Sequence, residues 1–375
     1  MSESKPTIAG FSVVSDQESP IRVAVIGTGH LGRIHARLLS QVAGAKLVAV
    51  CDVNEDACQA VASEHDVLAF QDVSSCLDQI DAAVVAAPTG CHPSIATTLI
   101  QAGKHVLVEK PLAATADDAT RLALRARTRN VVLQVGHVER FNPAFTALGE
   151  FGVDVKYAEA TRASRFPGRC LDVGVVMDLM IHDLDLVLSL TESPVKSIAA
   201  SGVSVVSKHE DIAEARLEFE CGLIANLKAS RISPTPARDM MLASPAGFAQ
   251  IDFGTPSLTT VATSQSILNR SFELNQETDN PLSYGDTLFE EHLPVATASL
   301  EPRNAILDEL HDFVVSIQSS SQPIVSGAAG ARAVTIAENI LDAIDQRAWY
   351  SYASELEQGP HAEVRRRIEQ HRRAA

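Results

Sequence analysis

Six residues near the N-terminus limit the possible folds of this chain more than any other segment. The motif Gly27-Thr28-Gly29-His30-Leu31-Gly32 follows an apolar run and opens an amphipathic segment that carries Ile34, Leu38 and Leu39. A Gly-x-Gly-x-x-Gly motif between a strand and a helix is typical of the phosphate-binding turn of a dinucleotide-binding α/β fold. We expect Gly27 to permit the tight turn, Gly29 to let the backbone approach a pyrophosphate, and Gly32 to allow close packing of helix and strand. Thr28, His30 and Leu31 would then lie with the free N–H groups of the helix N-terminus, beside the phosphates.

The same pattern of short apolar runs separated by longer amphipathic segments continues to about residue 142. The runs are Arg22–Ile26, Lys46–Cys51, Ala82–Ala86, Val106–Val108 and Val131–Gly136. They are nearly continuous in Val, Ala and Leu, which indicates strands buried on both faces, and helices between them indicate a parallel sheet. We therefore predict an α/β, doubly wound Rossmann domain over residues 21–142, preceded by a flexible arm at 1–20.

Residues after the second and third runs indicate which dinucleotide is bound. Asp52 ends the second run, where a carboxylate would accept from the ribose hydroxyls and repel a 2′-phosphate. No Arg or Lys follows within residues 53–56, so NAD is favoured over NADP. Pro88 and Thr89 follow the third run and are expected beside the nicotinamide ribose, while His92 either contacts the cofactor or begins the next helix.

The pattern changes after Pro143 and predicts an α+β domain over residues 143–350. Residues 174–190 resemble one largely buried helix, and further helices are expected near 306–317 and 331–344. Period-two alternation predicts antiparallel hairpins at 213–219 with 223–229 and at 240–243 with 248–253. Residues 255–300 are expected to form an irregular surface excursion, and the basic tail, 351–375, a solvated end.

Three further residues are candidates for chemistry. Lys110, in Glu109-Lys110-Pro111, follows a strand, so its side chain is expected at the cofactor edge of the sheet. Asp178 and His182 are four residues apart and so share one face of the 174–190 helix. Their neighbours Asp183 and Asp185 are expected at the surface or in helix caps.

Charge and cysteine content exclude several classes of protein. The formal net charge of -16 disfavours binding to nucleic acid or to an anionic membrane. Six cysteines without a Cys-x-x-Cys pair indicate reduced thiols rather than disulfides or a metal site. No apolar run reaches the length of a membrane span, and the polar first ten residues lack the core of a signal peptide. We expect a cytoplasmic protein. A local basic run of Arg162, Arg165 and Arg169 is either a binding site for a diphosphate or an exposed basic loop.

Together these motifs resemble the family of glucose–fructose oxidoreductase and inositol dehydrogenase, Gfo/Idh/MocA. The resemblance rests on Gly27–Gly32, Glu109–Pro111, Arg140–Pro143 and Asp178 with His182, over roughly residues 21–345. It implies that Lys110, Asp178 and His182 are catalytic and that Glu109 and Lys110 lie beside the cofactor. It also implies an open, largely antiparallel sheet in the second domain, often used for contacts within a homodimer or homotetramer.

Within that family, residues 136–143 and 178–183 look closest to members that oxidise UDP-N-acetylglucosamine at its 3-hydroxyl for lipid A or surface-polysaccharide synthesis. This implies substrate contacts by Arg140, Asn142, Arg165, Arg169 and His182. A dehydrogenase of free sugars or inositol is the alternative. A catalytically silent NAD-bound sensor is a third reading, against which the intact Lys110, Asp178 and His182 argue.

The residue types suit oxidation of a ring hydroxyl to a ketone. Neutral His182, with an ordinary pKa of about 6.5, is able to act as a base at neutral pH. Asp178 would orient His182, and Lys110 would hydrogen-bond the alkoxide or share the proton. Which of Lys110 and His182 takes the proton stays open at this point.

Overall fold

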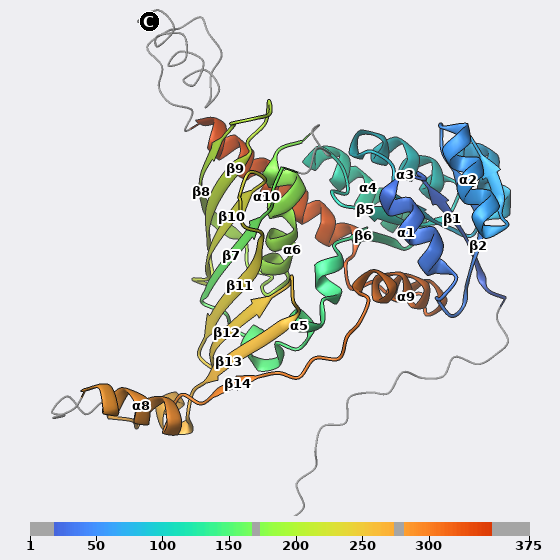
Figure 1. Cartoon of the computed structure of the whole chain (residues 1–375). Helices are drawn as coiled ribbons and strands as arrows, with labels where there is room; N and C mark the ends of the chain where they lie inside the picture. The colour runs from blue at the N-terminus through green and yellow to red at the C-terminus, as the bar shows by residue number, and fades with distance from the viewer. Residues whose placement is uncertain (1–18, 167–172, 274–280, 347–375) are drawn as a thin grey trace, which may run out of the picture.

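The structure is a computed structural model that describes residues 19–166, 173–273 and 281–346. Its two β-sheets stand side by side, with helices packed between them (Figure 1). Most of the predicted arm at 1–20, all of the tail at 351–375 and Arg169 lie outside the described residues.

The first sheet is parallel and has the strand order β3-β2-β1-β4-β5-β6. Its strands are β1 (Ile21–Ile26), β2 (Ala45–Cys51), β3 (Leu68–Phe70), β4 (Ala82–Val85), β5 (His105–Glu109) and β6 (Leu133–Gly136). Its helices are α1 (His30–Leu39), α2 (Glu55–His65), α3 (His92–Gln101) and α4 (Ala116–Arg129). The predicted doubly wound sheet is confirmed, with β3 as an additional short strand. The strand order reverses between β1 and β4, which places the ligand crevice at their carboxyl ends.

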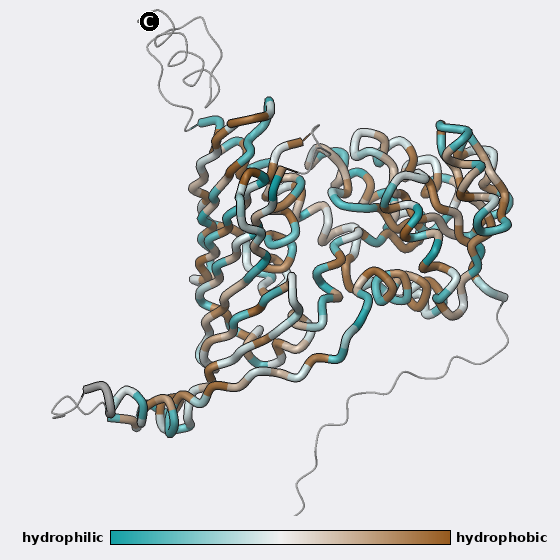
Figure 2. Tube along the Cα trace, viewed as in Figure 1, coloured by the Kyte–Doolittle hydropathy of each residue, from teal (hydrophilic) through white to brown (hydrophobic). Residues whose placement is uncertain are grey.

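Burial on both faces explains why these strands lack alternation. Ala24 and Ile26 of β1 belong to one apolar cluster, whereas Val23 and Val25 belong to a second on the opposite face. In Figure 2, hydrophobic (brown) residues recur along the strands of this half of the molecule, and hydrophilic (teal) residues lie in turns at its outer edge.

The second sheet has the strand order β14-β13-β12-β11-β7-β10-β9-β8. Its strands are β7 (Tyr157–Ala163), β8 (Val195–Val203), β9 (Ile212–Phe219), β10 (Ile224–Ser230), β11 (Ala237–Ser244), β12 (Gly247–Asp252), β13 (Ser257–Ala262) and β14 (Val295–Thr297). All pairs are antiparallel except β7 with β10. Both predicted hairpins are present, and the expected open, largely antiparallel sheet is confirmed. Along β9, Ala213, Ala215 and Leu217 are buried while Glu214 and Arg216 are exposed, so only one face is covered.

Residues 255–300 are more regular than expected. They contain β13 and β14 at one edge of the second sheet, with α7 (Gln265–Leu268) and α8 (Pro281–Glu291) between them. The expectation of an irregular excursion was wrong because the apolar signal of edge strands is weak: Leu258 is buried, but all three residues of β14 are exposed. Figure 1 shows α8 projecting beyond the edge of the sheet.

The remaining helices connect the two sheets. The predicted 174–190 helix is a π-helical turn, η5 (Val176–Met180), followed by α6 (Ile181–Ser189). The predicted later helices are α9 (Ala305–Gln318), which packs against the parallel sheet through Leu310, Phe313 and Val314, and α10 (Gly327–Gln346). Short helices complete the described chain: η1 (Val73–Gln79), η2 (Thr89–Cys91), η3 (Val138–Phe141), α5 (Pro143–Thr146) and η4 (Gly149–Gly152). Within the described residues, none of the helices combines the length and the apolar character needed to cross a membrane.

Candidate active site

In the glycine turn between β1 and α1, a side chain would clash at two of the three glycines and would meet open space at the third. Gly27 has a φ of +95°, and a Cβ there would lie 2.6 Å from the Ala86 carbonyl oxygen. A Cβ at Gly32 would lie 1.8 Å from the Gly27 oxygen, whereas one at Gly29 would meet nothing within 4 Å. The turn therefore needs glycine at 27 and 32 for its own packing. The open space beside Gly29, at the exposed N-terminus of α1, fits a phosphate group.

A cavity of about 340 Å³ adjoins this turn and fits the adenosine half of a dinucleotide. Gly27, Asp52, Val53 and Pro88 are among its lining residues. The Asp52 carboxylate accepts hydrogen bonds from the backbone N–H groups of Thr28 and Asn54, at 2.6 and 2.9 Å. Burial alone would raise the pKa of Asp52, but these donors outweigh it and leave the pKa below its ordinary value. The cavity thus presents an ionised carboxylate, fixed in place, where ribose hydroxyls would lie.

His92 braces two loops instead of facing the cofactor. Its ring is buried, with Nε2 2.8 Å from the Ala87 carbonyl oxygen and Nδ1 2.9 Å from that of Pro111. The expected cofactor contact of His92 is therefore corrected, because both ring nitrogens lie against main-chain carbonyls. His92 is the first residue of α3, which was the alternative prediction. This brace ties the Ala87–Thr89 turn after β4 to the segment after β5.

Lys110 joins the two halves of the molecule. Its Nζ donates to Asp178 Oδ1 at 2.9 Å and to the Asp178 carbonyl oxygen at 2.7 Å. Lys110 follows β5 of the parallel sheet, whereas Asp178 lies in the π-helical turn before α6. The expectation that Asp178 orients His182 is corrected, since Asp178 binds Lys110 and the Nδ1 atom of His182 has no partner among the described residues.

The environment of His182 favours its neutral form. Burial, and then the positive charges of Lys110 and Arg162, hold the pKa of His182 well below its ordinary value. The ring of His137 lies edge-on to it, with centroids 6.3 Å apart. His137 is buried, and neither of its nitrogens has a partner in the described part of the chain.

His137 is a candidate that sequence reasoning missed. In the β5–β6 register Glu109 pairs with Gly136, so His137 follows β6 directly beside the position of Lys110. The available signal was its place at the carboxyl end of a buried parallel strand, the same argument that singled out Lys110.

Four charged residues that were expected at the surface or at a ligand form buried ion pairs. Arg162 donates to Asp183 at 2.7 Å and to Glu139 at 2.8 Å, and Arg140 donates to Asp185 at 2.7 Å. The surface placement of Asp183 and Asp185 was therefore wrong, because each carboxylate is buried against a guanidinium group from another element. Arg162 and Arg140 neutralise these acids, so neither is a free cation for a diphosphate.

Asn142 and Arg165 complete the predicted substrate set. Asn142 is buried, where it caps α5 by accepting from the Ala144 N–H and donates to Glu139, so the expected substrate contact is replaced by a structural role. Arg165 is exposed, and its Nε donates to the Pro234 carbonyl oxygen at 3.3 Å.

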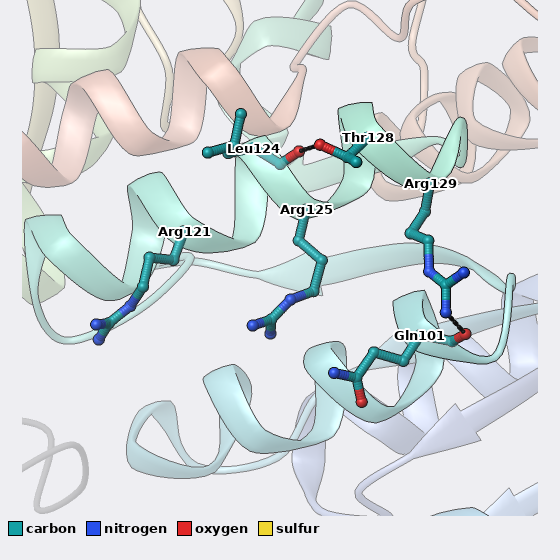
Figure 3. Close-up of a pocket in the computed structure, with 6 residues that line it drawn as sticks. All are labelled: Gln101, Arg121, Leu124, Arg125, Thr128 and Arg129. Carbon is teal, nitrogen blue, oxygen red and sulfur yellow. Dashed lines mark hydrogen bonds between the residues drawn. The ribbon is translucent and has the colours of Figure 1, made fainter.

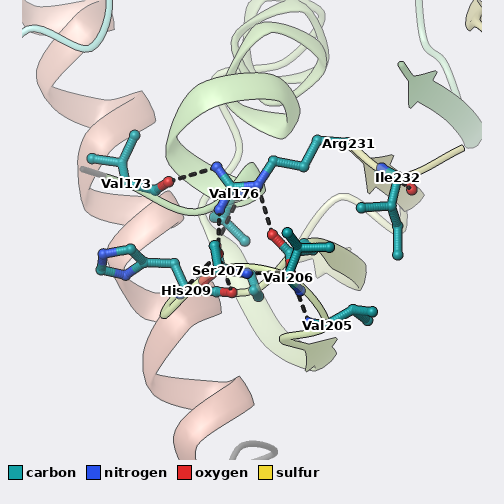
Figure 4. A network of polar contacts seen from close by, with 11 residues as sticks. Val173, Val176, Val205, Val206, Ser207, His209, Arg231 and Ile232 are labelled. Carbon is teal, nitrogen blue, oxygen red and sulfur yellow. Dashed lines mark hydrogen bonds and ion pairs between the residues drawn. The ribbon is translucent and has the colours of Figure 1, made fainter. Parts of the chain in front are cut away.

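The chain at the start of η5, which leads into α6, is held by a second buried network (Figure 4). Arg231 donates to Asp211 at 2.8 Å and to the Val173 carbonyl oxygen at 2.9 Å. The other carboxylate oxygen of Asp211 accepts from the N–H groups of residues 205–207. These contacts anchor the chain just before η5, and thereby Asp178 and His182.

Another cavity, of about 400 Å³, lies away from these residues between α3 and α4 (Figure 3). Three arginines of α4 line it, Arg121, Arg125 and Arg129. Arg121 is paired with Asp117 and Asp118, and Arg129 donates to the Gln101 carbonyl oxygen at 2.6 Å. We do not assign the cofactor to this cavity, because it is remote from the carboxyl ends of the strands.

Comparison with known proteins gives the family to which this fold belongs. Residues 21–137 match the model of the Gfo/Idh/MocA oxidoreductase family with an NAD-binding Rossmann fold, and residues 147–243 match the C-terminal domain of that family. The UDP-N-acetylglucosamine 3-dehydrogenase of Acidithiobacillus ferrooxidans is 33% identical over 326 residues, which are 87% of this chain and 97% of that protein. The scyllo-inositol 2-dehydrogenase of Bacillus subtilis is 30% identical over 236 residues, 58% of this chain and 69% of the relative.

Solved structures give the same result. A structure of the Acidithiobacillus ferrooxidans dehydrogenase aligns with a TM-score of 0.76 over 86% of this chain and 97% of its own. A levoglucosan dehydrogenase in complex with NADH aligns with a TM-score of 0.72 at 18% identity, which is a likeness of fold alone.

Proposed function

Since the chain belongs to the Gfo/Idh/MocA family and is an NAD-dependent oxidoreductase acting on a CH–OH group, we propose that it oxidises a UDP-N-acetylglucosamine-type nucleotide sugar to its 3-keto form. The observation that carries this proposal is the 33% identity to a UDP-N-acetylglucosamine 3-dehydrogenase along 97% of that enzyme. The product would supply an aminotransferase of lipid A or surface-polysaccharide synthesis.

We propose Lys110, Asp178 and His182 as the residues that handle the substrate hydroxyl. NAD, when bound, accepts the hydride from the carbinol carbon. His182 takes the hydroxyl proton on Nε2, because its Nδ1 is buried and its lowered pKa keeps the ring neutral. Lys110, fixed by two contacts to Asp178, donates to the developing alkoxide and keeps it beside His182.

This proposal assigns fewer residues to the cofactor than the sequence predicted, because His92 binds main-chain carbonyls instead. The Gly27–Gly32 turn holds the pyrophosphate and Asp52 the adenosine ribose. Pro88, which lines the adenosine cavity, and Thr89 after it lead from that cavity towards the nicotinamide ribose. We propose a division into a cofactor domain at 21–142 and a substrate domain at 143–350, in a cytoplasmic homodimer or homotetramer.

A substrate panel tests the proposal directly. The purified protein is incubated with NAD and, in turn, UDP-N-acetylglucosamine, other UDP-sugars, myo-inositol, scyllo-inositol and glucose, while NADH formation is followed at 340 nm. We expect NADH only with the UDP-amino sugar. Turnover of inositol or glucose, with every UDP-sugar ignored, would replace the proposal by the catabolic alternative, which the match to scyllo-inositol 2-dehydrogenase supports.

Arg165 is the member of the basic run that this proposal assigns to the diphosphate. Arg162 is held by Glu139 and Asp183, whereas Arg165 is exposed and bound only weakly, to a main-chain carbonyl. A charge-assisted hydrogen bond contributes about 1.5–3 kcal/mol, so Arg165→Ala should weaken UDP-sugar binding by roughly ten- to a hundredfold. NAD binding serves as the control and should not change.

A further inference from the structure

The side chain of Glu109 turns into the protein directly beside Lys110, instead of towards the cofactor as the sequence suggested. It is the last residue of β5, and its Oε1 accepts from His35 Nε2 at 2.6 Å. Its Oε2 accepts from the backbone N–H of Lys110 at 3.3 Å. The hydrogen bond between His35 and Glu109 is buried, since His35 is fully buried and Glu109 is only 9% exposed. The expected cofactor contact of Glu109 is therefore corrected.

Two neighbouring elements are shaped around this carboxylate. Gly136 lies opposite Glu109 in the β5–β6 register, and a Cβ there would lie 2.9 Å from Glu109 Oε2. His35 is one turn into α1, the helix whose N-terminus carries the phosphate-binding glycines. One buried hydrogen bond thus connects the helix that receives the pyrophosphate to the residue before Lys110.

The carboxylate of Glu109 is ionised within a cluster of titratable groups. Burial alone would raise its pKa, but the hydrogen bond and charge of His35 and the charge of Lys110 outweigh burial and leave the pKa below its ordinary value. The facing groups are His35 from α1, Lys110 just after β5, His137 after β6 and Glu309 from α9. Burial, and then the charge of Glu109, raise the pKa of Glu309 well above its ordinary value, so Glu309 keeps its proton.

We propose that His35 and Glu109 form a positioning pair for the reaction: Glu109 fixes the main chain at Lys110 and places a negative charge beside it, and His35 holds Glu109 in that geometry. The proposal rests on the role given to Lys110 under "Proposed function". A shift of α1 would be transmitted to the main chain at Lys110 through the single hydrogen bond between His35 and Glu109. Neither residue touches the substrate.

Glu109→Gln tests the proposal, because it removes the charge while keeping the size of the side chain and an acceptor for His35. We expect kcat to fall about tenfold or more, since misplacement of a reacting group is costly, while the dissociation constant of NADH changes less than twofold. Glu109 is among the charges that raise the pKa of His137, whose ring lies edge-on to His182, so its loss disfavours protonation of this histidine pair. The acid limb of the kcat/KM profile, measured from pH 5 to 9, should therefore move to lower pH.

Glu309→Gln is the matched control. It makes the same chemical change in the same cluster, but it replaces a carboxyl that is already protonated, so kcat and the pH profile should stay as in the unmodified enzyme. A folded Glu109→Gln variant with unchanged kcat and an unchanged acid limb would overturn the proposal. The same conclusion would follow if Glu309→Gln altered both as strongly as Glu109→Gln.

His35→Asn keeps the test decisive if Glu109→Gln does not fold. The shorter side chain cannot make the 2.6 Å bond, so kcat should fall about fivefold or more with little change in NADH binding. Unchanged kcat in a folded His35→Asn protein would overturn the proposal too. Lys110→Met distinguishes failure of the proposed function from failure of the positioning pair. Full activity of Lys110→Met would refute the role of Lys110 in the proposed function. An inactive Lys110→Met, together with fully active Glu109→Gln and His35→Asn, would refute the positioning pair alone.

Discussion

Burial favours the neutral form of His182, and in the mechanism proposed above this form limits the reaction at low pH. Because the pKa of His182 is held below its ordinary value, the neutral base persists when the pH falls through about 6.5, the pKa of a free imidazole. We therefore expect the acid limb of kcat/KM to lie below pH 6.5. A pH–rate profile in constant-ionic-strength buffers measures this, and a midpoint at or above 6.5 would contradict it.

The same depressed pKa contributes to stability in a defined direction. The folded protein requires neutral His182, so this contribution is fully present above the pKa of the unfolded state. It is lost as the pH falls below that value, because the unfolded chain then binds a proton that the folded protein does not. The acid limb should thus be recorded with a stability control at each pH.

Asp52 should determine the choice between NAD and NADP. Its carboxylate is fixed by the N–H groups of Thr28 and Asn54 and faces the adenosine cavity, where it would accept from the ribose hydroxyls and repel a 2′-phosphate. Asp52→Ala should therefore lower the ratio of kcat/KM for NAD to kcat/KM for NADP about tenfold or more, which corresponds to the loss of one charge-assisted hydrogen bond. Comparison of kcat/KM for the two cofactors tests this. Equal use of NADP by the unmodified protein would refute the assignment.

At the residue scale, the sequence predicted where the glycines, Asp52 and Lys110 lie in the fold better than it predicted the positions of the charged residues of the second half. The glycine motif can be recognised from six consecutive residues, although the close contact at Gly27 is with Ala86, which is distant in the sequence. Asp183 and Asp185 resemble surface acids because their partners, Arg162 and Arg140, lie 21 and 45 positions away. Only the folded arrangement shows that these charges neutralise one another.

At the scale of elements, the buried strands were predicted well and the peripheral ones poorly. The runs at Ala82–Val85 and Ile21–Ile26 are apolar on both faces, and this signal needs no knowledge of neighbours. The strand β3 is apolar but has only three residues, and all three residues of β14 are exposed, so neither shows the longer apolar run of a buried strand. The π-helical turn at Val176–Met180 has the same apolar composition as the helix after it, and so its altered spacing is invisible in sequence.

The Arg231–Asp211 pair should dominate the stability of the segment that precedes η5 and α6. Both side chains are fully buried, and removal of one partner leaves a buried charge uncompensated, at a cost of about 3–5 kcal/mol. We therefore expect Arg231→Met to lower the free energy of unfolding by about that amount in urea titrations. Arg22→Met is the control, because its pair with Asp81 is 44% and 42% exposed and contributes less than about 1 kcal/mol. Equal losses in the two variants would contradict this ranking.

For the whole molecule, the reaction site depends on how the two halves are held together. Lys110 belongs to the parallel sheet, while Asp178 and His182 belong to the helix packed on the second sheet. The helix α10 spans both: Gly330, near its start, packs against Val135 of β6, and Ile344, near its end, packs against Gly202 of β8. A change at α10 should therefore affect catalysis from a distance.

Gly330→Ala should act as a wedge between the halves. A Cβ at Gly330 would lie 2.4 Å from Val135 Cγ2, and Val135 is fully buried, so the helix or β6 must shift. Overpacking of this kind costs about 1–3 kcal/mol, partly offset by the higher helix propensity of Ala, about 1 kcal/mol. We expect a lower Tm, with kcat reduced more than NADH affinity. The Lys110–Asp178 contact joins the two halves and would be displaced by their separation, whereas the adenosine cavity lies within one half. Gly285→Ala, in α8, is the matched control. A Cβ there meets nothing within 4 Å, so its Tm should stay equal or rise, and a similar loss of kcat in both variants would show that α10 does not set the geometry of the site.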